Sequence, residues 1–148
     1  MRVLVSGARG LVGAALAAAL RAGGDEVLSL TRRPRGPGET GWDPGAGRLE
    51  ARDLEGLDAV VHLAGEPIAA RWTPARREAI RASRVTGTRL LAERLAALER
   101  PPAALVSVSA IGIYGDRGEE RLDETSPPGE GFLAGVCREW EAAAAPAA

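Results

Sequence analysis

The sequence contains no lysine, and all 19 of its basic residues are arginine. Lysine is therefore excluded as a catalytic base, a Schiff-base partner or a proton relay. Histidine, cysteine and tyrosine occur once each, as His62, Cys137 and Tyr114. One cysteine cannot form an internal disulfide, which favours a cytoplasmic location. One histidine and one cysteine give no ligand spacing typical of a metal site, so we expect none.

The chain also lacks an excess of charge and a long apolar run. Its formal net charge is −1, whereas a general nucleic-acid binder usually carries a strong basic excess. No apolar segment is long enough to span a bilayer, and Met1 leads directly into a strand pattern without a signal peptide. With 148 residues, of which 45% are hydrophobic, we expect one globular domain that binds neither nucleic acid nor membrane.

Short apolar runs alternate with segments of helical periodicity. Strands are predicted over Arg2–Ser6, Glu26–Thr31, Asp58–Ala64 and Ala104–Ser109. Helices are predicted over Leu11–Ala22, from Pro74 (capped by Thr73) to Leu98 with a break near Gly87, and over Phe132–Ala145. The remaining long segments are predicted to be irregular: Arg32–Gly56, with a turn at Trp42–Gly45, and Tyr114–Gly131.

This alternation predicts an α/β fold, a Rossmann-type parallel sheet with helices on both faces and right-handed crossovers. We expect one such domain over residues 1–148. The alanine-rich end of the sequence is a weak helix terminus, so the chain is expected to stop partway through an α/β protein.

A glycine-rich segment joins the first predicted strand to the first predicted helix. Its glycines, Gly7, Gly10 and Gly13, have the spacing G-x-x-G-x-x-G. They would permit a tight turn, a close approach of the backbone to a pyrophosphate, and close packing of the helix on the sheet. The helix N-terminus would offer free N–H groups to the phosphates. The segment therefore predicts a dinucleotide site formed by Gly7, Ala8, Arg9, Gly10, Leu11, Val12 and Gly13. The alternative is an ordinary turn, since the chain has 19 glycines.

The end of the second predicted strand indicates which dinucleotide binds. NAD sites usually place an acidic residue there to bind the ribose 2′-hydroxyl, but this strand ends in Thr31, Arg32 and Arg33. Two guanidinium groups, with help from Arg9, would suit a 2′-phosphate. We therefore favour NADP(H) over NAD(H), the alternative being that both arginines are merely solvated.

The sequence resembles the extended short-chain dehydrogenase/reductases, and within them the atypical group called epimerase family or NAD-dependent epimerase/dehydratase-like proteins. The segments that carry the resemblance are Val5–Gly13, Leu30–Pro34, Trp42–Pro44, Val60–Ile68, Arg71–Thr73, Ser83–Thr88, Ser107–Gly115 and Phe132–Glu141. They run along essentially the whole chain. The resemblance implies that relatives continue past this C-terminus with a substrate-binding region, and that this chain is the cofactor-binding part.

The same resemblance implies further cofactor contacts. Leu63, Ala64 and Gly65 would pass the cofactor's ribose, and Ser107 would lie beside the nicotinamide. Typical members use a serine and a Tyr-x-x-x-Lys pair on one helix face, in which the lysine lowers the tyrosine pKa and holds the ribose. Here Leu133 stands at the tyrosine position and Cys137 at the lysine position, so the usual pair is absent.

Two residues remain as catalytic candidates, Ser109 at the end of the fourth predicted strand and Tyr114, the only phenol. A structural tyrosine in a turn is the alternative for Tyr114. His62 lies between apolar residues within a strand and Cys137 on a helix, which favours structural roles for both.

Two functions follow. The first is an NADP(H)-dependent oxidoreductase or nucleoside-diphosphate-sugar epimerase acting on a small molecule such as a nucleotide sugar or a carbonyl compound. The second is a non-catalytic NADP(H)-binding sensor or partner-binding module, because the Tyr–Lys pair is missing. A fragment that folds without activity of its own is a third reading. The substrate and the oligomeric state stay open.

Overall fold

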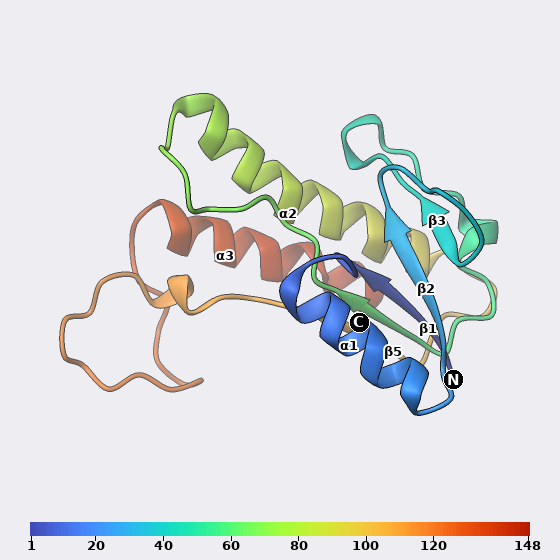
Figure 1. Ribbon diagram of the computed structural model, residues 1–148. Coiled ribbons are helices and arrows are strands. Elements are labelled where there is room, and N and C mark those ends of the chain that lie inside the picture. The colour runs from blue at the N-terminus through green and yellow to red at the C-terminus, as the bar shows by residue number, and fades with distance from the viewer.

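Five parallel strands form the centre of the protein, in a computed structural model that describes residues 1–148 (Figure 1). In chain order they are β1 (Arg2–Ser6), β2 (Glu26–Thr31), β3 (Glu39–Gly41), β4 (Ala59–His62) and β5 (Ala104–Ser107). Their order in the sheet is β3-β2-β1-β4-β5. The chain therefore moves outward from β1 to β3, then returns to the other side of β1. This confirms the predicted Rossmann-type parallel sheet.

Helices cover both faces of the sheet, as predicted (Figure 1). Helix α1 (Leu11–Ala22) packs through Ala17 on Val3 and Val5 of β1. The alternate residue, Leu4, belongs to the apolar cluster on the opposite face, beneath α2 (Pro74–Ala96). Helix α3 (Phe132–Ala143) lies beside α2. Period-two alternation in the strands thus supplies both layers of the core. No helix combines the length and the apolar character needed to cross a membrane.

The segment predicted to be irregular after β2 contains a short strand. Glu39–Gly41 pairs with Ser29–Thr31 of β2, with Thr40 opposite Leu30. Three residues that include a glycine carry little strand signal, because their conformation comes from pairing with the neighbouring strand. The predicted turn that follows is confirmed: Asp43 caps a 3₁₀ turn over Pro44–Ala46, and its Oδ1 accepts the Ala46 N–H at 3.2 Å.

Two strands end earlier than predicted. The prediction ran to Ala64 and to Ser109, whereas β4 ends at His62 and β5 at Ser107. After His62, the backbone N–H groups of Leu63 and Ala64 donate to the Ser6 Oγ rather than to a neighbouring strand. The chain therefore leaves the sheet where the Ser6 hydroxyl of β1 accepts its backbone hydrogen bonds.

The predicted break in the second helix does not occur. Helix α2 begins after Thr73, whose Oγ1 accepts the Arg76 N–H at 3.2 Å as predicted, and continues without interruption through Gly87. A Cβ at Gly87 would lie 3.3 Å from the Trp42 Cη2. The glycine is thus a packing position for a tryptophan. The helix predicted over Phe132–Ala145 also ends earlier than expected. Helix α3 ends at Ala143, and a 3₁₀ turn covers Ala145–Ala147.

Candidate cofactor-binding site

A cleft of about 790 Å³ lies at the carboxyl ends of β1, β2 and β4, next to α2. This is the edge where open parallel sheets bind ligands, at the point where the strand order reverses. The volume is within the range of small-molecule sites. Residues from five segments line it: Gly7, Gly10, Leu30, Thr31, Arg32, Trp42–Gly45, Leu63–Glu66, Ala79, Ala82, Ser83 and Thr86.

The three glycines of the loop between β1 and α1 serve different steric purposes. Gly7 has a φ of +68° and accepts the Gly10 N–H at 2.9 Å, closing a tight turn. A Cβ on Gly13 would lie 2.2 Å from the Gly7 carbonyl oxygen, so the first turn of α1 must pack against the loop. A Cβ on Gly10 would meet only the Gly7 oxygen, at 3.3 Å, and Gly10 lines the cleft.

The N-terminus of α1 lies at this cleft with its polar groups available. Gly10 is the N-cap and supplies no side-chain acceptor, and the first turn contains no acidic residue. The first N–H groups of a helix have no partner within it, and the helix dipole favours an anion there. Leu11 and Val12 follow, and these residues are 93% and 66% exposed. The loop thus has the steric and electrostatic properties of a phosphate site.

Ser6 and His62 fix the position of the loop that follows β4. The buried Ser6 Oγ accepts the Leu63 and Ala64 N–H groups, at 2.9 and 3.1 Å, and lies 2.7 Å from the His62 Nδ1. Since two donors occupy the oxygen, its own proton goes to Nδ1, which leaves the His62 proton on Nε2. Burial lowers the pKa of His62 to about 4, so the ring is neutral near pH 7.

His62 is therefore a structural residue, as predicted, although one of its two nitrogens has no hydrogen-bond partner. Nε2 is buried and unpaired. The imidazole meets the Trp42 ring edge to face, with centroids 5.8 Å apart and an interplanar angle of 88°. This aromatic contact joins β4 to the Trp42–Gly45 side of the cleft.

The three arginines assigned to a 2′-phosphate have different surroundings. Arg32 and Arg33 are both exposed, but only Arg32 lines the cleft. The Arg9 Nη2 lies 2.5 Å from the Glu39 Oε1, in an exposed ion pair. The second Glu39 oxygen accepts the Arg35 N–H at 2.6 Å, and this bond and Arg9 hold the pKa of Glu39 below its usual range. The sequence interpretation missed Glu39, because β3 was not predicted.

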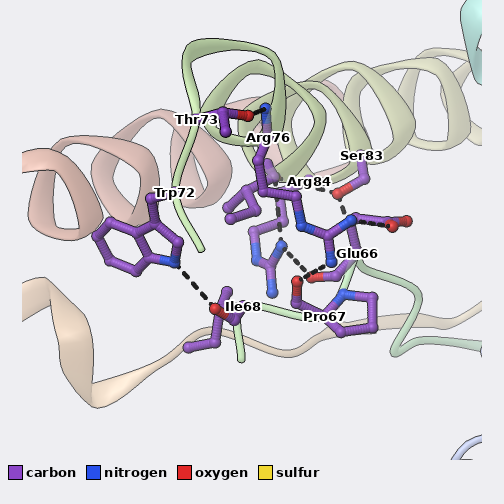
Figure 2. Close-up of polar contacts among 9 residues, drawn as sticks. Glu66, Pro67, Ile68, Trp72, Thr73, Arg76, Ser83 and Arg84 are labelled. Atoms are coloured by element: carbon purple, nitrogen blue, oxygen red, sulfur yellow. Dashed lines mark hydrogen bonds and ion pairs between the residues drawn. The ribbon is translucent and has the colours of Figure 1, made fainter. Parts of the chain in front are cut away.

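The loop after β4 is held by side chains of α2 (Figure 2). The Ser83 Oγ accepts the Glu66 N–H at 3.0 Å, and the Arg84 Nη1 donates to the Glu66 carbonyl oxygen at 3.0 Å. Arg76 makes two contacts, one with the Glu66 Oε1 at 2.8 Å and one with the Pro67 carbonyl oxygen at 2.6 Å. This loop therefore has a defined conformation next to the cleft.

The tryptophan before α2 extends the same set of contacts. The Trp72 Nε1 donates to the Ile68 carbonyl oxygen at 2.9 Å (Figure 2). We assigned no role to these loop–helix contacts from the sequence. The segments that carry the family resemblance, Val60–Ile68, Arg71–Thr73 and Ser83–Thr88, contain all of these residues except Arg76 and are the signal that could have indicated the contacts.

The candidate catalytic residues lie apart from the cleft lining. Ser109 follows β5, and its Oγ donates to the Glu141 Oε1 on α3 at 2.5 Å. Tyr114 is the last residue of a 3₁₀ turn, Ile111–Tyr114, and is half-buried. Ser107, assigned to the nicotinamide, is at the end of β5 opposite His62. The structure thus gathers Gly7, Gly10, Arg32 and Leu63–Gly65 at one cleft, and the other assigned residues lie outside its lining.

Helix α3 has Leu133 and Cys137 at the positions where typical family members have the Tyr–Lys pair. A Cβ on Gly112 would lie 3.4 Å from the Leu133 Cβ and 4.0 Å from the Cys137 Sγ, so both pack against the 3₁₀ turn. Cys137 is buried, and burial raises the pKa of its thiol. These residues pack between α3 and the turn.

The fold and the glycine-rich loop place the protein in the class of Rossmann-type nucleotide-binding folds. More specifically, the chain belongs to the NAD dependent epimerase/dehydratase family, whose model matches residues 3–133. This confirms the resemblance noted in the sequence.

The chain is similar to proteins from bacteria and animals. It is 41% identical over 147 residues to epimerase family protein Mb2239 of Mycobacterium bovis. This alignment covers 98% of this chain and 48% of the relative. The solved nucleoside-diphosphate sugar epimerase of Corynebacterium glutamicum has a TM-score of 0.87 and 47% identity, covering 99% of this chain and 31% of that one. Human epimerase family protein SDR39U1, solved with NADPH, has a TM-score of 0.83 and 37% identity. The match covers 97% of this chain and 48% of the human protein. The chain spans about half the length of the curated relatives it matches.

Proposed function

We propose that residues 1–148 form the NADP(H)-binding domain of an epimerase-family short-chain dehydrogenase/reductase. The observation that carries this proposal is the N-terminus of α1, which lies at the cleft without a side-chain cap or an acidic residue in its first turn. Free N–H groups there would bind the cofactor's pyrophosphate, and Gly10 leaves room for it. The residues present therefore fit a dinucleotide.

The preference for NADP(H) over NAD(H) rests on Arg32, which lines the cleft directly after β2. No carboxylate occupies that position. The acidic residues at the other end of β2 are used elsewhere: Asp25 binds the chain's amino terminus at 2.7 Å, and Glu26 pairs with Arg2 at 3.4 Å. The human relative solved with NADPH supports this preference.

Replacing both Arg32 and Arg33 with alanine tests the cofactor preference. Charge-assisted hydrogen bonds contribute about 1.5–3 kcal/mol each, so losing one from Arg32 should weaken NADPH binding by at least about tenfold. The affinity for NADH should stay the same. Arg35→Ala removes an exposed arginine nearby and is the matched control. An unchanged ratio of NADPH to NADH affinity in the double variant, measured by titration calorimetry, would contradict the preference.

We further propose that the whole protein acts on a nucleotide sugar or a related carbonyl compound, since the Corynebacterium relative is a nucleoside-diphosphate sugar epimerase. A bound nicotinamide cofactor supplies the hydride chemistry, and the protein orients it. The Ser109 hydroxyl donates its hydrogen bond to Glu141, so it could donate to a substrate only after that bond breaks. A cytoplasmic location stays a prediction.

The alternative is a non-catalytic NADP(H)-binding sensor or partner-binding module, favoured by the packing of Leu133 and Cys137 where a Tyr–Lys pair would stand. Incubating the full-length protein with NADPH and a panel of carbonyl compounds and nucleotide sugars separates the two. An enzyme is expected to turn over a panel member. Reduction of a carbonyl compound lowers the NADPH absorbance, whereas epimerisation of a nucleotide sugar leaves the cofactor unchanged overall and is followed by chromatography of the sugar product, with NADP⁺ supplied as well as NADPH. Tight NADPH binding without turnover of any panel member would favour the binding module.

A further inference from the structure

Arg9, in the glycine-rich loop after β1, forms an ion pair with a residue of β3. Its Nη2 lies 2.5 Å from the Glu39 Oε1. Because β2 lies between β1 and β3 in the sheet, the Arg9 side chain must cross β2 near its carboxyl end to reach Glu39. In Rossmann folds the end of this second strand is where the adenosine 2′ group of a dinucleotide is bound. The ion pair therefore spans the position at which a 2′-phosphate is expected.

The Glu39 carboxylate is fixed in place, whereas the Arg9 guanidinium is accessible. The second Glu39 oxygen accepts the Arg35 N–H at 2.6 Å. The side chains of Glu39 and Arg9 are 19% and 50% exposed. The pKa of Glu39 lies below its usual range because the Arg35 N–H and Arg9 stabilise its charged form, so the carboxylate is ionised at neutral pH. If one partner of the pair moves toward a ligand, it is therefore Arg9.

Of the three arginines assigned to the 2′-phosphate, only Arg9 forms an ion pair. Arg32 and Arg33 have no carboxylate within 4.0 Å. Gly10 and Arg32 line the cleft, whereas neither Arg9 nor Glu39 does. Glu39 thus neutralises Arg9 and keeps its charge outside the cleft lining, although the loop that carries Arg9 forms part of that lining.

The strength of this ion pair decides which ligands can break it. An exposed pair changes an equilibrium by at most about fivefold, because water and salt screen the two charges. A charge-assisted hydrogen bond to a phosphate is stronger and changes an equilibrium by about tenfold or more. A 2′-phosphate therefore displaces Glu39 from Arg9, whereas the uncharged 2′-hydroxyl of NADH leaves the pair intact.

We propose that Glu39 competes with the 2′-phosphate of NADP(H) for Arg9 and thereby limits the preference for NADP(H) over NAD(H). Arg9 binds Glu39 in the free chain and in the NADH complex, and it binds the phosphate in the NADPH complex. Glu39 is thus a specificity-determining residue that acts through Arg9. This proposal rests on the proposed function, since it requires a dinucleotide whose 2′ group lies beside Arg32.

Calorimetric titration of the 148-residue chain with NADPH and with NADH tests the proposal. Glu39→Gln keeps the size of the side chain and removes its charge. This variant should bind NADPH about two- to fivefold more tightly, because the 2′-phosphate no longer has to break an ion pair, and it should bind NADH as before. Arg9→Met should weaken NADPH binding by about tenfold or more. Adding Glu39→Gln to Arg9→Met should then bring no gain.

Glu139→Gln is the matched control, because it removes a carboxylate that pairs with Arg81 at 2.5 Å and lies outside the cleft lining. Both dinucleotides should bind this variant as they bind the unaltered chain. Weaker or unchanged NADPH binding by Glu39→Gln would overturn the proposal, since Glu39 would then orient Arg9 for the ligand or have no influence on it. An equal gain with and without Arg9 would overturn it too, because Glu39 would then repel the phosphate directly.

A measurement on the unaltered chain keeps the test independent of how the variants fold. The Arg9 Nε–H resonance, observed by ¹⁵N NMR and assigned by its absence from Arg9→Met, should shift with NADPH and stay in place with NADH. The same response to both dinucleotides would overturn the proposal. Failure of the unaltered chain to bind either dinucleotide would instead overturn the proposed function itself.

Discussion

Two loops contribute residues to the lining of the cleft, and their conformations are stabilised by different interactions. The Gly7–Gly13 loop is determined by backbone geometry within a few consecutive residues, through a positive φ at Gly7 and the contact of Gly13 with the Gly7 oxygen. The Gly65–Ile68 loop is held by side chains of Arg76, Ser83 and Arg84, ten to 18 residues away in the sequence. A substitution should therefore disrupt the Gly7–Gly13 loop by steric conflict, and it should disrupt the Gly65–Ile68 loop by removing polar contacts.

The largest effect on stability is expected from Gly13→Ala. The new Cβ would lie 2.2 Å from the Gly7 carbonyl oxygen, and neither backbone segment can move without disturbing β1 or α1. We expect a loss of about 3 kcal/mol or more in the free energy of unfolding, at the upper end for overpacking. Urea denaturation measures it. The control is Gly36→Ala, whose Cβ meets nothing within 4 Å; equal stability of the two variants would refute the steric account.

Acid should destabilise the folded chain through His62, the last residue of β4. The pKa of this residue is about 4 in the folded chain because burial lowers it, whereas an unfolded histidine titrates near pH ~6.5. The unfolded state therefore binds the proton first as the pH falls. The stabilisation is complete above about pH 6.5 and is lost toward pH ~4, by roughly 3 kcal/mol in total.

The pH dependence of the free energy of unfolding, measured for the unaltered chain and for His62→Gln, isolates this contribution. His62 is the only histidine, so the difference between the two curves should narrow as the pH falls from 6.5 to 4. Parallel curves over that range would show that His62 is not buried as a neutral group.

A smaller effect is expected from Arg76→Met, which removes two contacts from the Gly65–Ile68 loop. Arg76 and Glu66 are partly exposed, at 27% and 29%, so solvent screens their attraction. We expect a loss of about 1–2 kcal/mol. Hydrogen exchange should rise at Glu66–Ala70 and stay unchanged at Gly7–Gly13. Arg89→Met, on an exposed position of α2, is the control. Faster exchange in both loops would show that they are not independent.

The same difference explains what the sequence could and could not predict. The β1 and α1 boundaries and the glycine loop follow from local patterns, namely apolar alternation and glycine spacing. Strand β3 was missed because Glu39–Gly41 is extended only through pairing with β2. The break expected at Gly87 was wrong because the Trp42 ring, 45 residues earlier, fills the space beside that glycine. The contacts of Arg76 and Arg84 join distant segments and leave no periodic signal.

The central claim is that the N-terminus of α1 binds the pyrophosphate of a dinucleotide. Gly10→Val tests it most directly, because its side chain would extend into the path of the phosphates and meet otherwise only the Gly7 oxygen, at 3.3 Å. Calorimetric titration of the folded variant with NADPH should give an affinity at least about 100-fold weaker than that of the unaltered chain, equivalent to about 2.7 kcal/mol. Undiminished NADPH binding by a folded Gly10→Val protein would contradict the account.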